Sequence, residues 1–210
     1  MSNQLCFLKL HIKSQWLFYL LPAIFLYCFV LIYHAQLFET GIEEETVRKV
    51  FDSAQRMLLL FGIWYQYMGF RILLSPELKE LSCGIQIKWK LYWWICCTVL
   101  LLVLITPYLL WLMVQVGGDS KTITGFVFQC FVIQILTFFL MHLCRSSLAG
   151  LAFAVAYYFL NINCLLPQFF SIARIGVLPR DYSMMWYIVQ TIIGILLFIL
   201  IIIQDKRKIS

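Results

Sequence analysis

Charge is scarce in this 210-residue sequence: Asp, Glu, Lys and Arg make up 12% of it, while 63% is hydrophobic. Soluble domains carry about 25% charged residues. The chain therefore lacks the polar groups to cover a water-exposed surface, and most of that surface is expected to face lipid. The net charge is +6, and the basic residues lie in short connectors that flank apolar runs. Such placement is typical of membrane topology signals and argues against nucleic-acid binding.

Several catalytic and metal-binding signatures are also missing from the sequence. A P-loop requires G-x-x-x-x-G-K-[ST], and the nearest stretch, GGDSKT at 117–122, leaves only two residues between Gly118 and Lys121. The eight cysteines contain no pair of C-x-x-C motifs, which argues against a zinc or redox site. There is no G-x-S-x-G nucleophile motif. We therefore expect no ATP site, no metal and no cofactor in this chain, and cysteines that behave as small apolar residues.

Long apolar stretches dominate what is present, and a membrane helix needs about 20 such residues. The first stretch is too long for a signal peptide and lacks a small-residue cleavage site, so it is predicted to be a span. Arg56, near the start of the second stretch, can extend to the headgroups. The predicted spans are 15–38, 52–70, 91–116, 122–144, 146–166 and 184–204. The expected fold is a single all-α domain, 1–210, with six transmembrane helices.

Two further segments are predicted to lie at the membrane surface. Residues 3–13 mix apolar side chains with Lys9, His11 and Lys13, as in a helix lying in the inner interface. Residues 167–183 mix prolines and charges with aromatic and aliphatic side chains. We expect that segment to be half-embedded in the outer leaflet.

Lysine and arginine predict the orientation, because cytoplasmic connectors carry an excess of them. If both termini are cytoplasmic, the inner set is Lys9, Lys13, Arg71, Lys79, Lys88, Lys90, Arg145, Lys206, Arg207 and Lys208. The outer set is then smaller, namely Arg48, Lys49, Arg56, Lys121, Arg174 and Arg180. This bias favours both termini in the cytoplasm.

The connector between the second and third spans contains SPELKELSCG, which predicts a short capped helix at 75–83. Ser75 suits the N-cap, Pro76 the first helical position, and Glu77 the positive end of the helix dipole. Gly84 suits the left-handed residue that ends a helix. Such a helix is short and stiff, is charged enough to lie in water, and is joined directly to two spans.

The order of these elements resembles that of type-2 ABC exporter permeases. The resemblance rests on the layout of the whole chain and on SPELKELS following LLLFGIWYQYMGFRILL. It implies an interfacial elbow helix at 3–13 and a coupling helix that docks on a separate ATPase, with ATP and Mg on that partner. Ser75, Glu77, Leu78, Lys79 and Glu80 are the expected coupling residues: the charged ones offer polar contacts, and Leu78 an apolar one. The chain itself is then not an enzyme.

The resemblance also implies a dimer, formed with a second copy or a paralogous permease, in a bacterial cytoplasmic membrane. Ser146, Gly150 and Ala154 repeat every four residues, a spacing that lets helices approach closely. We expect this face to pack on another helix, in the same subunit or across the dimer interface. Trp64 and Tyr67 are candidates for a hydrophobic substrate path. The expected cargo is amphipathic, with a peptide such as a bacteriocin first and a lipid or drug second.

Two alternatives remain open. Glu43, Glu44 and Arg48 match E-E-x-x-x-R, and Phe138 and His142 match F-x-x-x-H, as in CAAX-type intramembrane proteases. However, the glutamates precede the second span, and His142 is expected at the opposite membrane face. The other alternative is a membrane scaffold or sensor subunit that transports nothing.

Overall fold

The computed structural model describes residues 13–39, 44–71, 74, 87–117, 119–174 and 177–206. These residues form helices joined by short connectors, and no β-strand occurs among them apart from an isolated bridge between Arg174 and Val177. The all-α prediction is confirmed. The predicted coupling helix 75–83 and residues 3–12 of the predicted interfacial helix lie outside the described residues.

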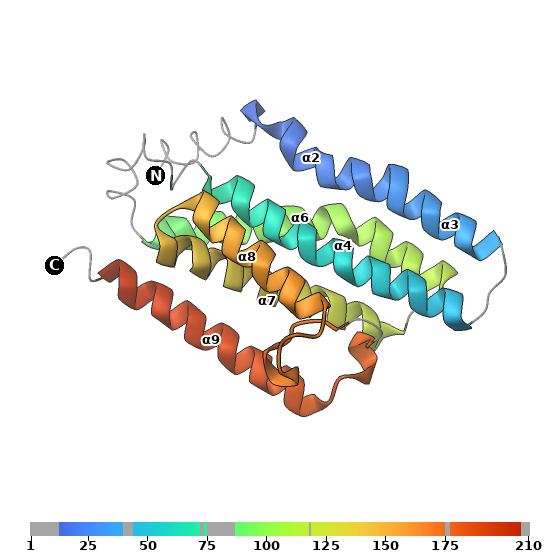
Figure 1. The fold of residues 1–210 in the computed structure, drawn as a ribbon. Coiled ribbons are helices and arrows are strands. Elements are labelled where there is room, and N and C mark those ends of the chain that lie inside the picture. The colour runs from blue at the N-terminus through green and yellow to red at the C-terminus, as the bar shows by residue number, and fades with distance from the viewer. Residues whose placement is uncertain are drawn as a thin grey trace.

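Seven α-helices and three shorter helical turns make up the described chain (Figure 1). They are α2 (Trp16–Phe25), the π-helical turn η1 (Leu26–Val30), α3 (Leu31–Glu39), α4 (Glu44–Phe70), α6 (Ile87–Gln115), α7 (Ser120–Cys144), α8 (Ser147–Ile162), the 3-10 turns η3 (Gln168–Phe170) and η4 (Pro179–Asp181), and α9 (Met184–Lys206). Since η1 joins α2 to α3 without a break, these three form one long first helix.

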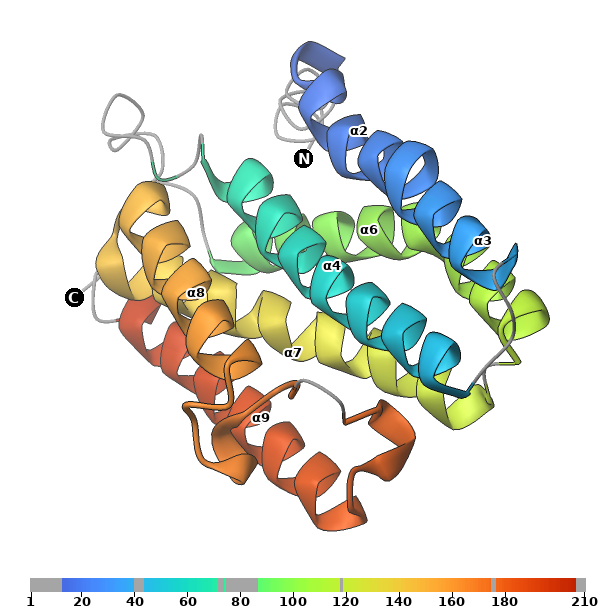
Figure 2. The same cartoon turned by 45° about the vertical axis from the view of Figure 1, so that its right-hand side comes forward.

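Successive long helices run in alternating directions along one bundle (Figures 1 and 2). We call the end where α2, α6 and α8 begin the near end, and the end where α4, α7 and α9 begin the far end. Side-chain contacts fix the registers. Gln55 of α4 meets Gln129 of α7, and further along Phe70 packs on Phe138, so α4 and α7 run in the same direction.

Helix α4 occupies the centre of the bundle and contacts five neighbouring helices. The Tyr65 hydroxyl donates to the Tyr19 carbonyl of α2, and Gly69 faces Cys97 of α6. On its other sides α4 reaches α3, α7 and α8 through side-chain hydrogen bonds. Leu58, Ile63 and most other apolar residues of α4 are therefore buried in the protein and turned away from lipid.

Local chemistry defines several helix ends. The Asp119 carboxylate accepts from the Thr122 N–H at 3.2 Å and caps α7, and the Ser146 hydroxyl caps α8 by accepting from the Ala149 N–H at 3.3 Å. Between these helices Arg145 is left-handed, with φ = 50°. This single residue turns the chain back on itself.

Four of the described helices are long and apolar enough to cross a membrane: Trp16–Leu37, Lys90–Gln115, Ser120–Cys144 and Met184–Gln204. They correspond to the first, third, fourth and sixth predicted spans. The second prediction, 52–70, falls on α4, which begins earlier, at Glu44, and has a charged first half. Membrane character is thus supported for four helices, and six spans are not established by length and hydropathy.

The fifth predicted span, 146–166, corresponds to α8, which ends four residues early at Ile162. Cys164 is left-handed there, with φ = 58°, and the Leu165 N–H donates to the Leu160 carbonyl at 3.0 Å. This hydrogen bond spans five residues and resembles a Schellman ending, which glycine usually supplies. Because a cysteine takes the glycine position, the sequence gives no signal for the stop.

Candidate functional site

The predicted coupling residues Ser75, Glu77, Leu78, Lys79 and Glu80 all lie outside the described part of the chain. The helices on either side are described: α4 ends at Phe70 and α6 begins at Ile87, both at the near end (Figure 1). The start of α2 and the end of α9 lie at the same end.

The small-residue face of α8 packs within this chain. Gly150 lies against Met141 of α7 so closely that a Cβ atom on it would overlap the Met141 backbone. Ala154 is fully buried in a cluster with Ile63 of α4 and Ile133 of α7. Ser146 acts as the N-cap of α8. Gly150 and Ala154 are therefore already covered by helices of the same chain.

Trp64 and Tyr67 lie on the side of α4 that faces the first helix. The Trp64 indole N–H donates to the Phe18 carbonyl at 2.9 Å, and the Trp64 and Tyr67 ring centroids are 6.2 Å apart. The Trp64 hydrogen bond thus joins α2 to α4 at the near end. Both side chains are partly buried.

The residues of the protease alternative are not brought together. Glu44 and Arg48 are exposed in the first turns of α4 at the far end, whereas His142 lies in the last turn of α7 at the near end. Phe138 packs beside His142, with ring centroids 6.1 Å apart. Glu43 lies outside the described residues. The length of the bundle separates the described carboxylate from the histidine, so they have no common site for a water or a metal.

A row of buried polar side chains, four amides and one hydroxyl, lies between α4, α6 and α7 and is not among the predicted sites. We call it the polar seam: Gln55, Gln66, Thr98, Gln129 and Gln134, all buried. The Gln55 amide donates to Gln129 Oε1 at 2.9 Å, and the Thr98 hydroxyl donates to Gln134 Oε1 at 2.7 Å. The sequence does hold one signal for this seam, which is the presence of glutamines inside the predicted spans.

Part of the polar seam is unsatisfied among the described residues. Gln66 is fully buried, and neither its Nε2 nor its Oε1 atom has a hydrogen-bond partner. The Nε2 atoms of Gln129 and Gln134 are also without acceptors. An unpaired amide in an apolar interior costs free energy of about 1–3 kcal/mol. Polar groups retained at such a cost between membrane helices make the seam a candidate for a pathway or binding site.

A second polar cluster joins the far halves of α3, α4 and α6. His34 is fully buried, and its two ring nitrogens lie 2.5 Å from the Ser53 hydroxyl and 3.0 Å from the Tyr108 hydroxyl. Ser53 also donates to the Val50 carbonyl at 3.0 Å, so its proton is engaged. The Trp111 ring is nearly parallel to the His34 ring, with the ring centroids 6.3 Å apart. With both nitrogens satisfied and no exposed face, His34 ties three helices together.

The segment between α8 and α9 folds back into the bundle at the far end. Ser171, Ile172 and Ala173 are buried. The Asn161 side-chain oxygen of α8 accepts from the Ser171 hydroxyl at 2.8 Å and from the Ala173 N–H at 3.2 Å. From α9, Trp186 donates its indole N–H to the Ser171 carbonyl at 2.9 Å. The segment is thereby fixed between the end of α8 and the first turn of α9.

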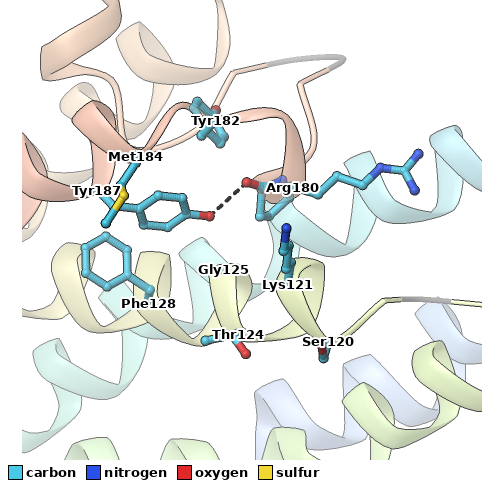
Figure 3. Close-up of a pocket in the computed structure, with 10 residues that line it drawn as sticks. Ser120, Lys121, Thr124, Gly125, Phe128, Arg180, Tyr182, Met184 and Tyr187 are labelled. Carbon is cyan, nitrogen blue, oxygen red and sulfur yellow. Dashed lines mark hydrogen bonds between the residues drawn. The ribbon is translucent and has the colours of Figure 1, made fainter.

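A cleft of about 540 Å³ opens at the far end between α7, the segment 179–182 and the start of α9 (Figure 3). Lys121 rises from α7 toward the 179–182 segment, and Phe128, Met184 and Tyr187 gather on the other side. The Tyr187 hydroxyl donates to the Pro179 carbonyl at 2.8 Å. Gly125 permits this closure, since a Cβ there would overlap Pro179. One wall of the cleft is therefore apolar and the other polar.

The charged groups around the cleft are unevenly placed. Hydrogen bonds from Thr122 are the main cause of a lowered pKa at Asp119, with a smaller contribution from the Arg180 charge. Asp181 accepts from the Leu178 N–H at 3.3 Å and lies 3.8 Å from Arg180. Neither aspartate lines the cleft. Burial raises the pKa of Tyr182 to about 12, so that its hydroxyl, which accepts from the Arg174 N–H at 2.9 Å, stays protonated.

Nothing in the described residues suggests a metal centre, since no group of three or more His, Cys, Asp or Glu side chains lies together there. Neither the protein-family models nor the curated proteins nor the solved structures compared with the chain include a match to it.

Proposed function

We propose that this chain is the membrane-spanning subunit of an ATP-driven exporter of the type-2 ABC class, crossing the membrane six times with both termini in the cytoplasm. The supporting observation is the position of α4. It is the central helix, it carries two of the five residues of the polar seam, and it leads directly into the connector where the coupling helix is predicted. A movement of that connector would reach the seam through a single rigid element.

In this proposal α4 crosses the membrane despite its moderate hydropathy. Its charged residues lie in the far half, where Asp52 and Arg56 pair one turn apart, and no charged residue follows Arg56 before the helix ends. Since five helices contact α4, its buried polar side chains Gln55 and Gln66 face protein and need not be compatible with lipid. Its exposed charges lie in the first turns, at the far end. The hydrophobicity required of a lipid-facing helix does not apply to it.

Helix α8 also crosses in this proposal, although its 16 residues span only about 24 Å. The hydrocarbon core is about 30 Å thick. The buried stretch 171–173 is hydrogen-bonded to Asn161 in the last turn of α8. Non-helical backbone is tolerated at membrane depth where protein buries it. The half-embedded segment thus completes the crossing that α8 begins.

The exporter would work with two partners, of which the ATPase would bind at the near end. A separate ATPase, carrying ATP and Mg, would dock on the predicted coupling helix, and a second copy or a paralogue would complete the dimer. ATP binding would favour one of two arrangements of the helices, as in other ligand-driven switches. No covalent chemistry falls to this chain. The bilayer would be the bacterial cytoplasmic membrane.

The polar seam favours a peptide cargo over a purely hydrocarbon one. Its glutamines offer both donors and acceptors, which match the N–H and C=O groups of a peptide backbone. Lipid or drug cargo remains second. In this proposal Trp64 and Tyr67 belong to the packing between α2 and α4, and the seam lines the route.

The test is affinity purification of the native chain in mild detergent, with mass spectrometry of the proteins that accompany it. The variant Leu78→Asp/Glu80→Lys is compared with Leu165→Asp/Glu44→Lys, which makes the same chemical changes at exposed positions of the far end. A cassette ATPase should accompany the wild type and the far-end variant in near-equal amount and be lost from the first variant.

Absence of an ATPase from all three preparations would contradict the proposal. The scaffold alternative would then be preferred, because the protease residues lie at opposite ends of the bundle. An ATPase that stays bound to the Leu78→Asp/Glu80→Lys variant would place coupling elsewhere on the near end.

A further inference from the structure

The cleft beside Lys121 has features that the exporter proposal does not use. It lies at the beginnings of α7 and α9, two of the helices apolar and long enough to cross a membrane. The cleft is therefore at the level of the lipid headgroups. Its volume of about 540 Å³ is within the range of ligand sites, roughly 300–1,000 Å³.

Lys121 occupies an electrostatically unfavourable position. It is in the first turn of α7, where the helix dipole is positive and a cation is disfavoured. No ion pair of Lys121 is found within the described part of the chain. Arg180, by contrast, is close to both Asp119 and Asp181, and its guanidinium points away from the apolar wall (Figure 3). Lys121 is thus the uncompensated cation of the cleft.

An anion in the cleft would relieve this arrangement. It would meet the Lys121 ammonium and the positive end of the α7 dipole. Both nearby carboxylates are directed elsewhere: Asp119 toward Thr122, and Asp181 toward Leu178 and Arg180. The polar wall is therefore complementary to negative charge.

The opposite wall suits hydrocarbon. The ring centroids of Phe128 and Tyr187 are 5.3 Å apart in an edge-to-face pair, and Met184 is 80% exposed beside them. A free inorganic anion would leave this wall uncovered, whereas a lipid would place its phosphate by Lys121 and the start of an acyl chain along Phe128 and Met184. Basic pockets between membrane helices bind anionic headgroups in this manner.

We infer that the cleft between α7 and the start of α9 binds one anionic glycerophospholipid, with its phosphate at Lys121 and an acyl chain on Phe128 and Met184. This site is independent of the ATPase and of the cargo. The bound lipid would bridge the half-embedded segment to α7.

The test is native mass spectrometry of the full chain in detergent, titrated separately with phosphatidylglycerol and with phosphatidylcholine. The variants are Lys121→Gln, Thr124→Trp and Lys49→Gln. Lys49 is a matched control, since it is also a far-end lysine but pairs with Glu45 on the surface at 2.7 Å. One lysine near an anionic surface contributes about a fivefold change in affinity.

The wild type should retain phosphatidylglycerol in preference to phosphatidylcholine. Lys121→Gln should weaken phosphatidylglycerol binding about fivefold and phosphatidylcholine binding less, because the choline already compensates the phosphate of that lipid. Lys49→Gln should match the wild type. Thr124→Trp should reduce retention of both lipids by filling the cleft. Equal helical content by circular dichroism shows that the variants are folded.

Three results would overturn the inference. Equal retention of the two lipids would remove the anion requirement. Equal loss in Lys49→Gln and Lys121→Gln would show a general charge effect outside the cleft. Displacement of phosphatidylglycerol by millimolar inorganic phosphate would show that the polar wall takes free phosphate and that the apolar wall contributes nothing.

Discussion

The side-chain amide of Gln55 donates to Gln129 Oε1 at 2.9 Å, which joins α4 to α7 inside the bundle. Replacement of Gln55 by Leu should lower the free energy of unfolding by about 1 kcal/mol, because Gln129 is left buried without its donor. The double variant Gln55→Leu/Gln129→Leu should recover most of that loss. Thermal unfolding in detergent measures both; additive losses in the double variant would argue against a direct bond.

Gln66 should respond in the opposite direction. Neither of its side-chain polar atoms has a partner among the described residues, so Gln66→Met should raise the free energy of unfolding by about 1 kcal/mol. Gln115→Met, at the exposed end of α6, is the matched control and should change little. If the seam lines the export route, Gln66→Met should also lower transport of a peptide cargo. A destabilised Gln66→Met protein would mean that a partner satisfies the amide.

Two glycines within helices should differ sharply in their tolerance of a methyl group. Gly150→Ala places a Cβ into the Met141 backbone, so we expect a loss of about 2 kcal/mol or more. The Cβ of Gly194→Ala would lie 3.7 Å from the Ile135 Cδ1 atom, an ordinary contact. That variant should gain about 0.5 kcal/mol from helix propensity. Similar unfolding midpoints for the two variants would contradict the close α7–α8 contact.

Asn161 should hold the half-embedded segment in place, whereas Asn163 should not. Asn161→Leu removes the acceptor of the Ser171 hydroxyl and the Ala173 N–H. Peptides covering 163–183 should then exchange amide hydrogens about tenfold faster, as expected for the loss of about 1.4 kcal/mol of local stability. The exposed Asn163 side chain donates to the Phe159 carbonyl of α8 and does not reach the 171–173 stretch, so Asn163→Leu serves as the control. Unchanged exchange in Asn161→Leu would show that other contacts hold the segment.

The six-crossing arrangement makes a direct prediction for topology. Single cysteines placed at 41, 80 and 118 in a cysteine-free background should alternate in labelling by an impermeant maleimide. Positions 41 and 118 should be labelled from outside and position 80 only after permeabilisation, because α4 and α6 run in opposite directions. Labelling of 41 and 80 from the same side would show that α4 does not cross.

The sequence was sufficient to predict the helices whose ends are marked by charge or caps. The prediction 122–144 differs from α7 by two residues, and 184–204 lies within α9. It failed at the end of α8, because a left-handed Cys164 replaces the usual glycine. It also failed to foresee the long first half of α4, whose charges are accommodated by pairing and by neighbouring helices. Hydropathy is calculated from the local sequence, so it does not register contacts with neighbouring helices that offset a charge.

The candidate sites were predicted less well than the helices. The sequence placed Lys121 in an outer turn and gave no reason to pair it with Phe128 and Met184, which the fold brings to one cleft. The glutamines of the polar seam are separated by up to 79 positions and converge only through the register of α4 and α7. Trp64 and Tyr67 are predicted to line a substrate path, whereas in the structure Trp64 is hydrogen-bonded to α2 and Tyr67 lies beside it. The coupling residues 75–80 remain a prediction.

The π-helical turn Leu26–Val30 sets the rotational phase of the first helix. Leu26, Val30 and His34 are all buried at intervals of four, a spacing that would drift by about 40° per step in a continuous α-helix. The wider turn absorbs this drift and keeps His34 aimed at Ser53 and Tyr108. Deleting one residue from this turn would rotate everything beyond it by about 100° while shortening the helix by only about 1.5 Å. A single-residue deletion at this position would therefore rotate α3 and turn His34 away from Ser53 and Tyr108. Whether the protein tolerates the deletion depends on the loss of these His34 contacts and not on the shorter span.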